Sequence, residues 1–414
     1  MGTVDITPEV PLPLFGRAGR SQPFLSIASQ LEANFMLMSD GTAGDAALVT
    51  IDSLYPSQAL VEKIIARTSE LGLNIGPASL IVVASHTHNA PSLDQSKPKL
   101  GQYVPDYLTF VANRIAAALV KMKESSEGAS TIMRHGTAQS RFSVYRRRWL
   151  NGIDFARLRI SKRIAMAPNP TRPIDQTLNL VVIQDYEDKP QAVLWSWPCH
   201  AVSEPEPNAV SADFPGALRQ HIRTQLGDSS LPVLFLPGFS GDIRPALTRR
   251  LSLIKSGSWV GICPRFAKRS PHQVKLMHAN LATTFDRAWS DARKSNRIDS
   301  ANMTLARKRR ILELEEIRTD AGGLDSLSCD DWRIGPLRIK AVSAEVAAGY
   351  THRTDSDEPM TFLTGCAGQV FGYLPTDDQI IYGGYEVDGF ASAFSVPGSF
   401  HSQIESKVSA LIGP

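Results

Sequence analysis

A short apolar run that leads directly into two histidines constrains the fold of this chain more than any other feature. The sequence IVVA at residues 81–84 has the character of a buried strand, and SHTHNAP follows it without a break. Asn and Pro in that second sequence indicate the loop that leaves the strand. Because side chains alternate along a strand, we expect His86 and His88 to point to the same side of it.

The segments before this strand predict its place in a sheet. Residues 46–52 form a second apolar run that ends in Asp52, and residues 56–72 carry apolar residues at helical spacing. Strand, helix and strand in this order are typical of a parallel crossover, whose functional side chains lie at the carboxyl ends of the strands. His86 and His88 follow such an end, so the sequence predicts a site there.

The rest of the chain mixes helical and strand patterns. We expect helices over residues 105–123, 214–226 and 272–293. Strands are expected over residues 129–160, 177–199 and 231–237, and the last hundred residues return to strands and turns. No clear linker interrupts the chain. We therefore predict an α/β fold of mixed β-sheets flanked by helices, in one domain over residues 1–414.

Composition excludes several classes of protein. A net charge of +3 with a pI of about 8.6 is too mild to indicate nucleic acid or an anionic membrane as the main partner. No segment approaches the roughly 18 apolar residues of a membrane helix, and the start has no signal peptide, so we expect a cytoplasmic protein. The four cysteines form no CxxC pair, which argues against a disulfide scaffold and a cysteine–zinc site.

Two neighbouring histidines are a common start of a metal site. Zinc binds neutral imidazole nitrogens, and a catalytic zinc site needs further protein ligands. Among the other histidines, only His200 directly follows an apolar strand sequence, AVLWSWPC, in the way that His86 does. From these residues alone, an alternative stays open, in which His86 and His88 are polar residues at a solvated loop.

Five motifs occur in the order found in the neutral ceramidase family: HTHNAP, PCHAVSE, SADFPG, GFSGDIRP and GYLPTDDQIIYGGYE. The opening GTVDITP and the strand that ends in Asp52 are also similar, so the resemblance spans about residues 3 to 395. That family consists of zinc-dependent amidases that cleave ceramide to a sphingoid base and a fatty acid. The resemblance implies a neutral-ceramidase-like catalytic domain, without the family's additional C-terminal immunoglobulin-like module.

The resemblance also implies a zinc site. The first histidine of the HTH motif and the histidine that ends the later strand are zinc ligands in the family, and they correspond to His86 and His200. The family's glutamate ligand corresponds to Glu345, although the Pro and Gly that precede it in the family are Ser343 and Ala344 here. The last ligand, a tyrosine, corresponds to Tyr373.

The same resemblance implies three catalytic residues. The second histidine of the motif corresponds to His88, and the tyrosine of the Tyr-Glu pair corresponds to Tyr385. The family's active-site arginine corresponds to Arg146, with Arg147 as the second candidate. We expect these side chains to hold the substrate oxygen, stabilise the tetrahedral oxyanion or transfer a proton.

One departure from the family changes the expected nucleophile. Ceramidases carry a GDVSPN-type segment with a serine, whereas this chain reads GDIRPA and places Arg244 at the serine's position. Nucleophilic attack by a side chain at that position is therefore excluded, and no His or Asp spacing marks the nearby Ser240 as activated. Two interpretations of Arg244 stay open: a contact to an anionic group of the substrate, or an ordinary loop arginine.

The prediction is a zinc-dependent hydrolase that cleaves the amide bond of an N-acyl amine or ceramide-like substrate, with metal-activated water as the nucleophile. Two alternatives stay open. A zinc esterase or lactonase of the metallo-β-lactamase fold would need an HxHxDH motif, but Asn89, Ala90 and Pro91 follow the histidines here. A non-catalytic relative would keep the fold and bind a ligand without cleaving it.

Overall fold

The structure is a computed structural model that describes residues 1–39, 44–125, 131–266, 270–300, 303–320, 323–352 and 358–413. The predicted crossover is present: β4 (Asp45–Ile51) and β5 (Leu80–Ala84) pair in parallel, and α1 (Gln58–Glu70) connects them. β3 (Glu32–Ser39) and β1 (Gly2–Asp5) extend this sheet antiparallel, in the order β1-β3-β4-β5. The prediction of an α/β fold with mixed sheets and flanking helices is confirmed.

Local sequence explains why α1 begins and ends where it does. The Ser57 side chain accepts a hydrogen bond from the Leu60 amide at 3.1 Å, which caps the first turn. Leu60 and Ile64 are fully buried and lie on one face of the helix. Gly72, with φ 91°, follows the last turn and adopts the left-handed conformation that ends many helices.

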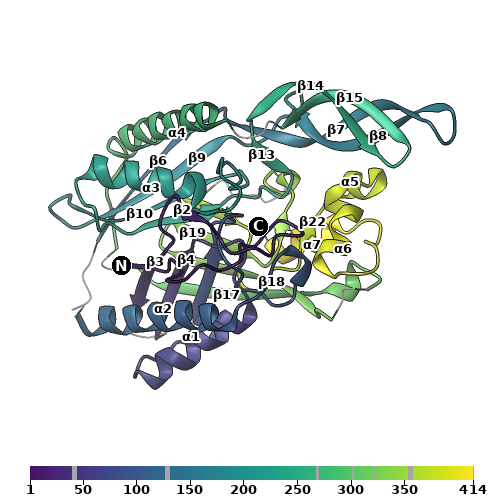
Figure 1. The fold of residues 1–414 in the computed structure, drawn as a ribbon. Helices are drawn as coiled ribbons and strands as arrows, with labels where there is room; N and C mark the ends of the chain where they lie inside the picture. Colours follow the sequence, from purple (N-terminus) through teal and green to yellow (C-terminus); the bar gives the residue numbers. More distant parts are fainter. Residues whose placement is uncertain are drawn as a thin grey trace.

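A second sheet stacks on the first. Its order is β12-β10-β9-β6-β16, and only β10 and β12 pair in parallel. The strands are β6 (Ile132–Gln139), β9 (Thr177–Gln184), β10 (Pro190–Trp197), β12 (Val233–Pro237) and β16 (Ile298–Asp299). α3 (Asp213–Leu226) and α4 (Pro271–Ala292) cover its outer face, and α2 (Pro105–Ser125) joins α1 below the first sheet (Figure 1).

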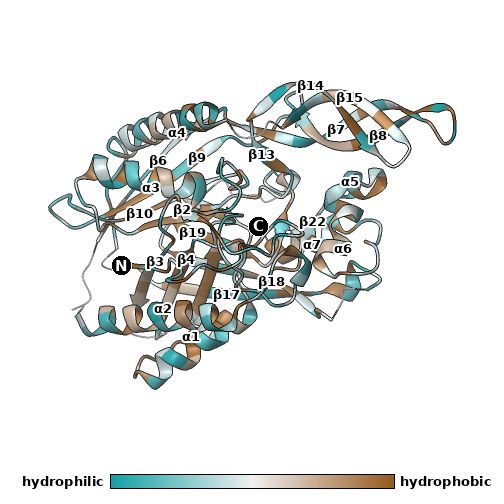
Figure 2. Ribbon diagram, viewed as in Figure 1, coloured by the Kyte–Doolittle hydropathy of each residue, from teal (hydrophilic) through white to brown (hydrophobic). Residues whose placement is uncertain are grey.

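Alternating strand residues fill three apolar layers. In β4, Ala47 and Val49 pack with α1 and α2, whereas Ala46 and Leu48 pack against the second sheet. The strands are accordingly hydrophobic over most of their length, and the helices alternate in hydropathy (Figure 2). The result is a helix–sheet–sheet–helix stack, in which the carboxyl ends of β4, β5 and β10 can supply residues to one site.

The C-terminal part adds a third sheet, of order β17-β18-β19-β21, and a small parallel pair, β20 with β22. The strands are β17 (Leu305–Glu313), β18 (Ser326–Ile334), β19 (Leu337–Val342), β20 (Glu345–Val346), β21 (Thr361–Thr364) and β22 (Tyr373–Leu374). The helices are α5 (Asp377–Tyr382), α6 (Ala391–Phe394) and α7 (Glu405–Ile412), with a π-helical turn at Tyr385–Gly389.

A β-arm projects from this body, at the upper right of Figure 1. It contains β7 (Ser143–Asp154), β8 (Arg159–Asn169), β13 (Ile243–Pro245), β14 (Thr248–Ser256) and β15 (Trp259–Phe266). The strand order is β13-β7-β15-β14, and β8 also pairs with β7. A small core of Leu150, Ala167, Trp259 and Cys263 supports the arm. A minor parallel pair, β2 (Ser26–Ile27) with β11 (Ala209–Val210), lies elsewhere.

Within the described ranges, none of the helices has the length and hydropathy needed to cross a membrane. All four cysteines lie in described segments and are buried and free, as expected for a chain without a disulfide scaffold.

Buried ion pairs link the first sheet to α3. Arg219 Nη2 donates to Asp52 Oδ2 at 2.7 Å, and Arg223 binds both carboxylate oxygens of Glu32 at 2.7 and 2.8 Å. We expect Arg219→Leu to lower the free energy of unfolding by about 3 kcal/mol, because it leaves the Asp52 carboxylate buried without its partner. Urea unfolding followed by circular dichroism measures the change.

The matched control is Gln225→Leu, an exposed position on the same helix, which should change the free energy of unfolding by less than about 0.5 kcal/mol. Equal effects of the two leucine substitutions would contradict the structural role of the Arg219–Asp52 pair.

Candidate metal centre

His86 stands beyond the end of its strand, not in it. β5 ends at Ala84, and His86 has φ 64°, in the left-handed region that residues with side chains rarely adopt. The expectation that strand alternation places His86 and His88 on one side is therefore wrong, because His86 does not belong to the strand. A strained turn brings the two rings together instead, with centroids 5.0 Å apart.

Backbone carbonyls orient all three histidines of the centre. His86 Nδ1 lies 3.2 Å from Leu54 O, His88 Nδ1 lies 2.8 Å from Gly16 O, and His200 Nδ1 lies 2.8 Å from Ser240 O. Because a carbonyl only accepts hydrogen bonds, each Nδ1 must donate, and the neutral ring then carries its lone pair on Nε2. The three Nε2 atoms are thus prepared as ligands or bases.

Gly16 makes the contact to His88 possible. A Cβ atom at this position would lie 2.8 Å from His88 Nδ1, and the residue has φ 94°. Only glycine meets both conditions without displacing the ring.

The ligand atoms of the three histidines lie within 4.8 Å of one another. Glu345 Oε2 joins them, at 3.3 Å from His86 Nε2 and 3.1 Å from His200 Nε2. Three of these buried atoms, His86 Nε2, His88 Nε2 and Glu345 Oε2, make no hydrogen bond within the described chain. The distances of Glu345 Oε2 to the two imidazole nitrogens satisfy only the criterion for an ion pair. Buried polar atoms without partners are costly, so their convergence needs an explanation.

A divalent cation would satisfy these atoms together. Imidazole nitrogens and a carboxylate oxygen form a donor set that suits zinc, and the buried group could hold such an ion. His200 Nε2 also lies 3.1 Å from Arg146 Nη1, so an ion on this nitrogen requires the guanidinium to release it.

Glu345 and Tyr373 are brought together by the small parallel pair of strands. β20 and β22 place the two residues opposite each other, and both side chains are buried. This arrangement agrees with the expectation that Tyr373 belongs to the same site as Glu345, although it does not by itself identify either residue as a ligand.

Arg146 is the central cation of the site. Its Nε donates to Glu386 Oε1 at 2.6 Å, and its guanidinium carbon lies 5.2 Å from the ring centroid of Tyr373 and 5.5 Å from that of Tyr385. Arg147, the second candidate, points elsewhere, since it donates to Glu386 Oε2 and to Gly383 O at 2.6 Å each. The structure therefore places Arg146, and not Arg147, at the histidines.

The pKa values follow from burial and neighbouring charges. Burial holds the pKa of His88 well below its ordinary value, and it lowers the pKa of His200 to about 3 together with the charge of Arg146. Burial acts to raise the pKa of Glu345, but His86 and His200 hold it well below its ordinary value. Glu345 is thus ionised, and His88 and His200 are neutral at ordinary pH, which are the forms that bind metals. Burial acts to lower the pKa of His86, but Cys366 and Glu345 hold it well above its ordinary value, so His86 has to lose a proton when a metal binds.

Two residues of the centre were missed by sequence reasoning. The Tyr55 hydroxyl donates to Glu345 Oε1 through a short hydrogen bond. Cys366 Sγ lies 3.5 Å from His86 Nδ1, the ring nitrogen that is not part of the Nε2 cluster. Tyr55 follows the end of β4, which neighbours β5, so its position at a strand end was the available signal. Cys366 had no such signal.

Comparisons with known proteins show the fold. No protein-family model matches the chain, and no curated protein matches it in sequence. The neutral ceramidase from Pseudomonas aeruginosa superposes with a TM-score of 0.67 at 16% identity, over 96% of this chain and 70% of that one. A structure of a ceramidase complexed with C2 gives 0.68 at 14%, over 96% and 71%. The predicted neutral-ceramidase-like fold is confirmed.

We expect His86 and His200 to hold zinc through Nε2. His86→Ala and His200→Ala should each reduce the metal content from about one zinc per chain to nearly none, because each removes one ligand of a small set. Elemental analysis of the purified proteins measures this. His221→Ala, which removes a surface histidine paired with Asp286, is the control and should keep its zinc. Full zinc content in both site variants would refute the assignment.

Tyr55 should act by orienting Glu345. Tyr55→Phe removes one hydroxyl and is expected to weaken zinc binding by roughly 10- to 100-fold, as loss of a bond to a ligand usually does. Competition with a chelating dye gives the dissociation constant. Tyr107→Phe removes another buried hydroxyl, one that donates to Ile6 O at 2.9 Å, and should leave zinc affinity unchanged. Equal zinc affinities of the wild type and Tyr55→Phe would contradict the role of Tyr55 in orienting Glu345.

Proposed function

We propose that this chain is a zinc-dependent hydrolase that cleaves a linear amide bond of an N-acyl amine or ceramide-like substrate. The observation that carries the proposal is the convergence of three buried ligand atoms, on His86, His88 and Glu345, which make no hydrogen bond within the described chain and lie beside a buried arginine. The neutral-ceramidase fold supports it, since the similar structures are named as ceramidases. We further propose that residues 1–414 act as a single catalytic domain.

In this proposal His86, His200, Glu345 and Tyr373 hold the zinc. A bound zinc polarises the substrate carbonyl and lowers the pKa of water to about 7, so that water can act as the nucleophile. His200 and Glu345 are in the protonation states that such a site requires. Burial and the nearby Glu345 keep the pKa of the Tyr373 phenol well above its ordinary value. Arg146 lowers this pKa and so favours the phenolate, which is the form that a metal ligand would adopt.

His88 has the properties of a proton acceptor. Its Nδ1 is engaged by Gly16 O, and its Nε2 is buried and without a partner in the described chain. The low pKa keeps this nitrogen unprotonated in the free protein, which leaves it open to a proton from the attacking water, but it also makes the ring a weak base. In this proposal His88 later passes that proton to the leaving amine.

Arg146 and Tyr385 can stabilise the charge that develops on the carbonyl oxygen. Arg146 Nη2 is a buried donor without a hydrogen-bond partner among the described residues, and the guanidinium is always charged. Glu386 fixes the group in place through Nε. A donor already held in position is worth about 3 kcal/mol to the transition state, because no reorganisation is needed.

The test is a screen of matched N-acyl amides, esters and ceramides with the purified, zinc-loaded protein. We expect amide cleavage, detected as release of free amine, and its loss in His86→Ala. Ester cleavage alone would favour the esterase alternative, and zinc binding without turnover of any substrate would favour a non-catalytic protein.

Ser240→Ala decides between water and serine as the nucleophile. Ser240 offers its backbone carbonyl to His200, and its hydroxyl makes no hydrogen bond to a histidine or carboxylate within the described segments. The variant should therefore keep kcat within a few-fold, whereas removal of a true nucleophile costs about 10⁴- to 10⁶-fold. A loss of that size would revive the serine mechanism.

A further inference from the structure

A cavity of about 500 Å³ lies in the β-arm, and the proposed catalytic residues do not line it. Its described lining consists of Arg163, Ile164, Ala165, Met166, Arg244, Ile254, Trp259, Arg265 and Phe266. Three of these nine residues are arginines and none is acidic. The volume falls within the range of small-molecule sites, and the lining combines apolar walls with a few strong hydrogen-bond donors.

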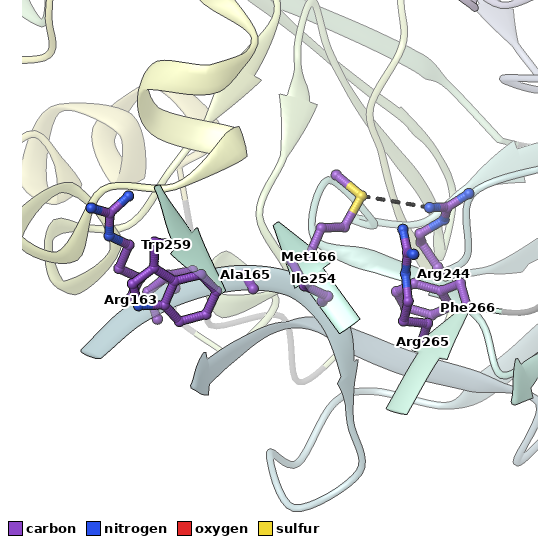
Figure 3. A pocket seen from close by; sticks show the side chains of 9 residues that line it. Arg163, Ala165, Met166, Arg244, Ile254, Trp259, Arg265 and Phe266 are labelled. Atoms are coloured by element: carbon purple, nitrogen blue, oxygen red, sulfur yellow. Dashed lines mark hydrogen bonds between the residues drawn. The ribbon is translucent and has the colours of Figure 1, made fainter. Parts of the chain in front are cut away.

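The cavity has a basic end and an apolar middle. Figure 3 shows Arg244 and Arg265 together beside Phe266, with Met166 and Ile254 between them and the far end. The guanidinium carbon of Arg244 lies 4.9 Å from the centroid of the Phe266 ring, and its Nη1 lies 3.5 Å from Met166 Sδ. These contacts hold Arg244 at the cavity wall.

The far end is already partly neutralised. Arg163 lies there with Trp259 (Figure 3), and its Nη2 is 3.4 Å from the buried carboxylate of Asp154. The end formed by Arg244 and Arg265 is the better place for an anion, because two guanidinium groups lie there together and can bind the oxygens of a carboxylate, sulfonate or phosphate.

The cavity borders the candidate metal centre. Ile243, the neighbour of Arg244 on β13, accepts a hydrogen bond from the His200 amide at 3.4 Å. Ile164 of the lining lies so close to Gly384 that a Cβ there would meet it at 3.0 Å, and Tyr385 is the next residue. Burial raises the pKa of Tyr385, and Arg244 is near enough to act against that rise.

The charge of the arm favours anions at this place. Residues 143–169 and 248–266 contain eleven Lys or Arg and one acidic residue, Asp154, whereas the whole chain has 44 basic and 41 acidic residues. Positive charge is thus concentrated in the β-arm that carries the cavity, although the net charge of the chain is small. Such a concentration attracts anionic ligands and speeds their association.

We propose that Arg244 and Arg265 bind an anionic group of the substrate, so that the enzyme prefers N-acyl amides that carry a negative charge. This inference rests on the proposed amide hydrolysis at the adjacent centre. The apolar wall of Met166, Ile254 and Phe266 covers the alkyl part of the substrate. Arg244 occupies the place of the serine in the GDVSPN-type segment, so the substitution that removes one nucleophile also supplies a specificity residue.

The test compares matched substrate pairs on the zinc-loaded protein. N-octanoylglycine has its carboxylate on the amine half, and N-octanoylethanolamine is its neutral counterpart. The monoethylamide of suberic acid has its carboxylate on the acyl half, and N-ethyloctanamide is neutral. We expect kcat/KM to favour the anionic member of at least one pair by on the order of 10-fold, through KM, since charged hydrogen bonds contribute that much.

Arg244→Gln and Arg265→Gln should each remove most of this preference. Arg249→Gln, which changes an exposed arginine of β14 outside the cavity, should keep it. Equal turnover of both members of each pair by the wild type would overturn the anion site while leaving the proposed function intact. The same conclusion would follow if Arg249→Gln reduced the preference as much as Arg244→Gln.

If no amide is cleaved at all, the proposed function fails and the anion site is judged by binding. Calorimetric titration of N-octanoylglycine and suberic acid monoethylamide into wild type and Arg244→Gln then decides. Binding of either compound that is lost in Arg244→Gln supports the site, and absence of binding to the wild type, or equal binding to both proteins, refutes it.

Discussion

The position of one buried carboxylate, Glu345, determines how the parts of this protein meet. Its Oε2 lies within 3.3 Å of two imidazole nitrogens, on His86 after β5 and on His200 after β10, which belong to different sheets. Its Oε1 accepts a hydrogen bond from Tyr55, after β4. An ionised group in such an environment is stable only when partners surround it, so the three strand ends have to be placed accurately.

Backbone carbonyls and a second carboxylate provide that accuracy. Carbonyls of Leu54, Gly16 and Ser240 select the tautomer of the three histidines, and Glu386 joins Arg146 and Arg147 across the base of the β-arm. Leu54 and Ser240 closely follow the buried strands β4 and β12, whereas Gly16 lies in the N-terminal loop and Glu386 in the π-helical turn. Hydrogen bonds from several parts of the fold thus orient the side chains of the site. The arm, which supplies Arg146 and Arg244, then adds the groups that would contact the substrate.

Sequence reasoning succeeded where the signal was local. The histidines at 86 and 200 were found because apolar strand sequences lead into them, and both lie at the centre. Glu345 and Tyr373 could be named only through the resemblance, since a glutamate in an alternating strand and a buried tyrosine carry no local mark. Tyr55 was missed although it follows a strand end, because its partner Glu345 is 290 residues away in the chain. The choice between Arg146 and Arg147 needed the side-chain directions.

The sequence alone determined the strand–helix–strand crossover, the mixed α/β class and the pair of strand-end histidines, because hydrophobic periodicity acts over a few neighbouring residues. The tertiary structure alone decided which distant side chains complete the centre, that His86 reaches it through a left-handed turn, and that three arginines gather around one cavity. These outcomes depend on distances between segments that pack together only after the sheets have stacked, and no local pattern encodes those distances.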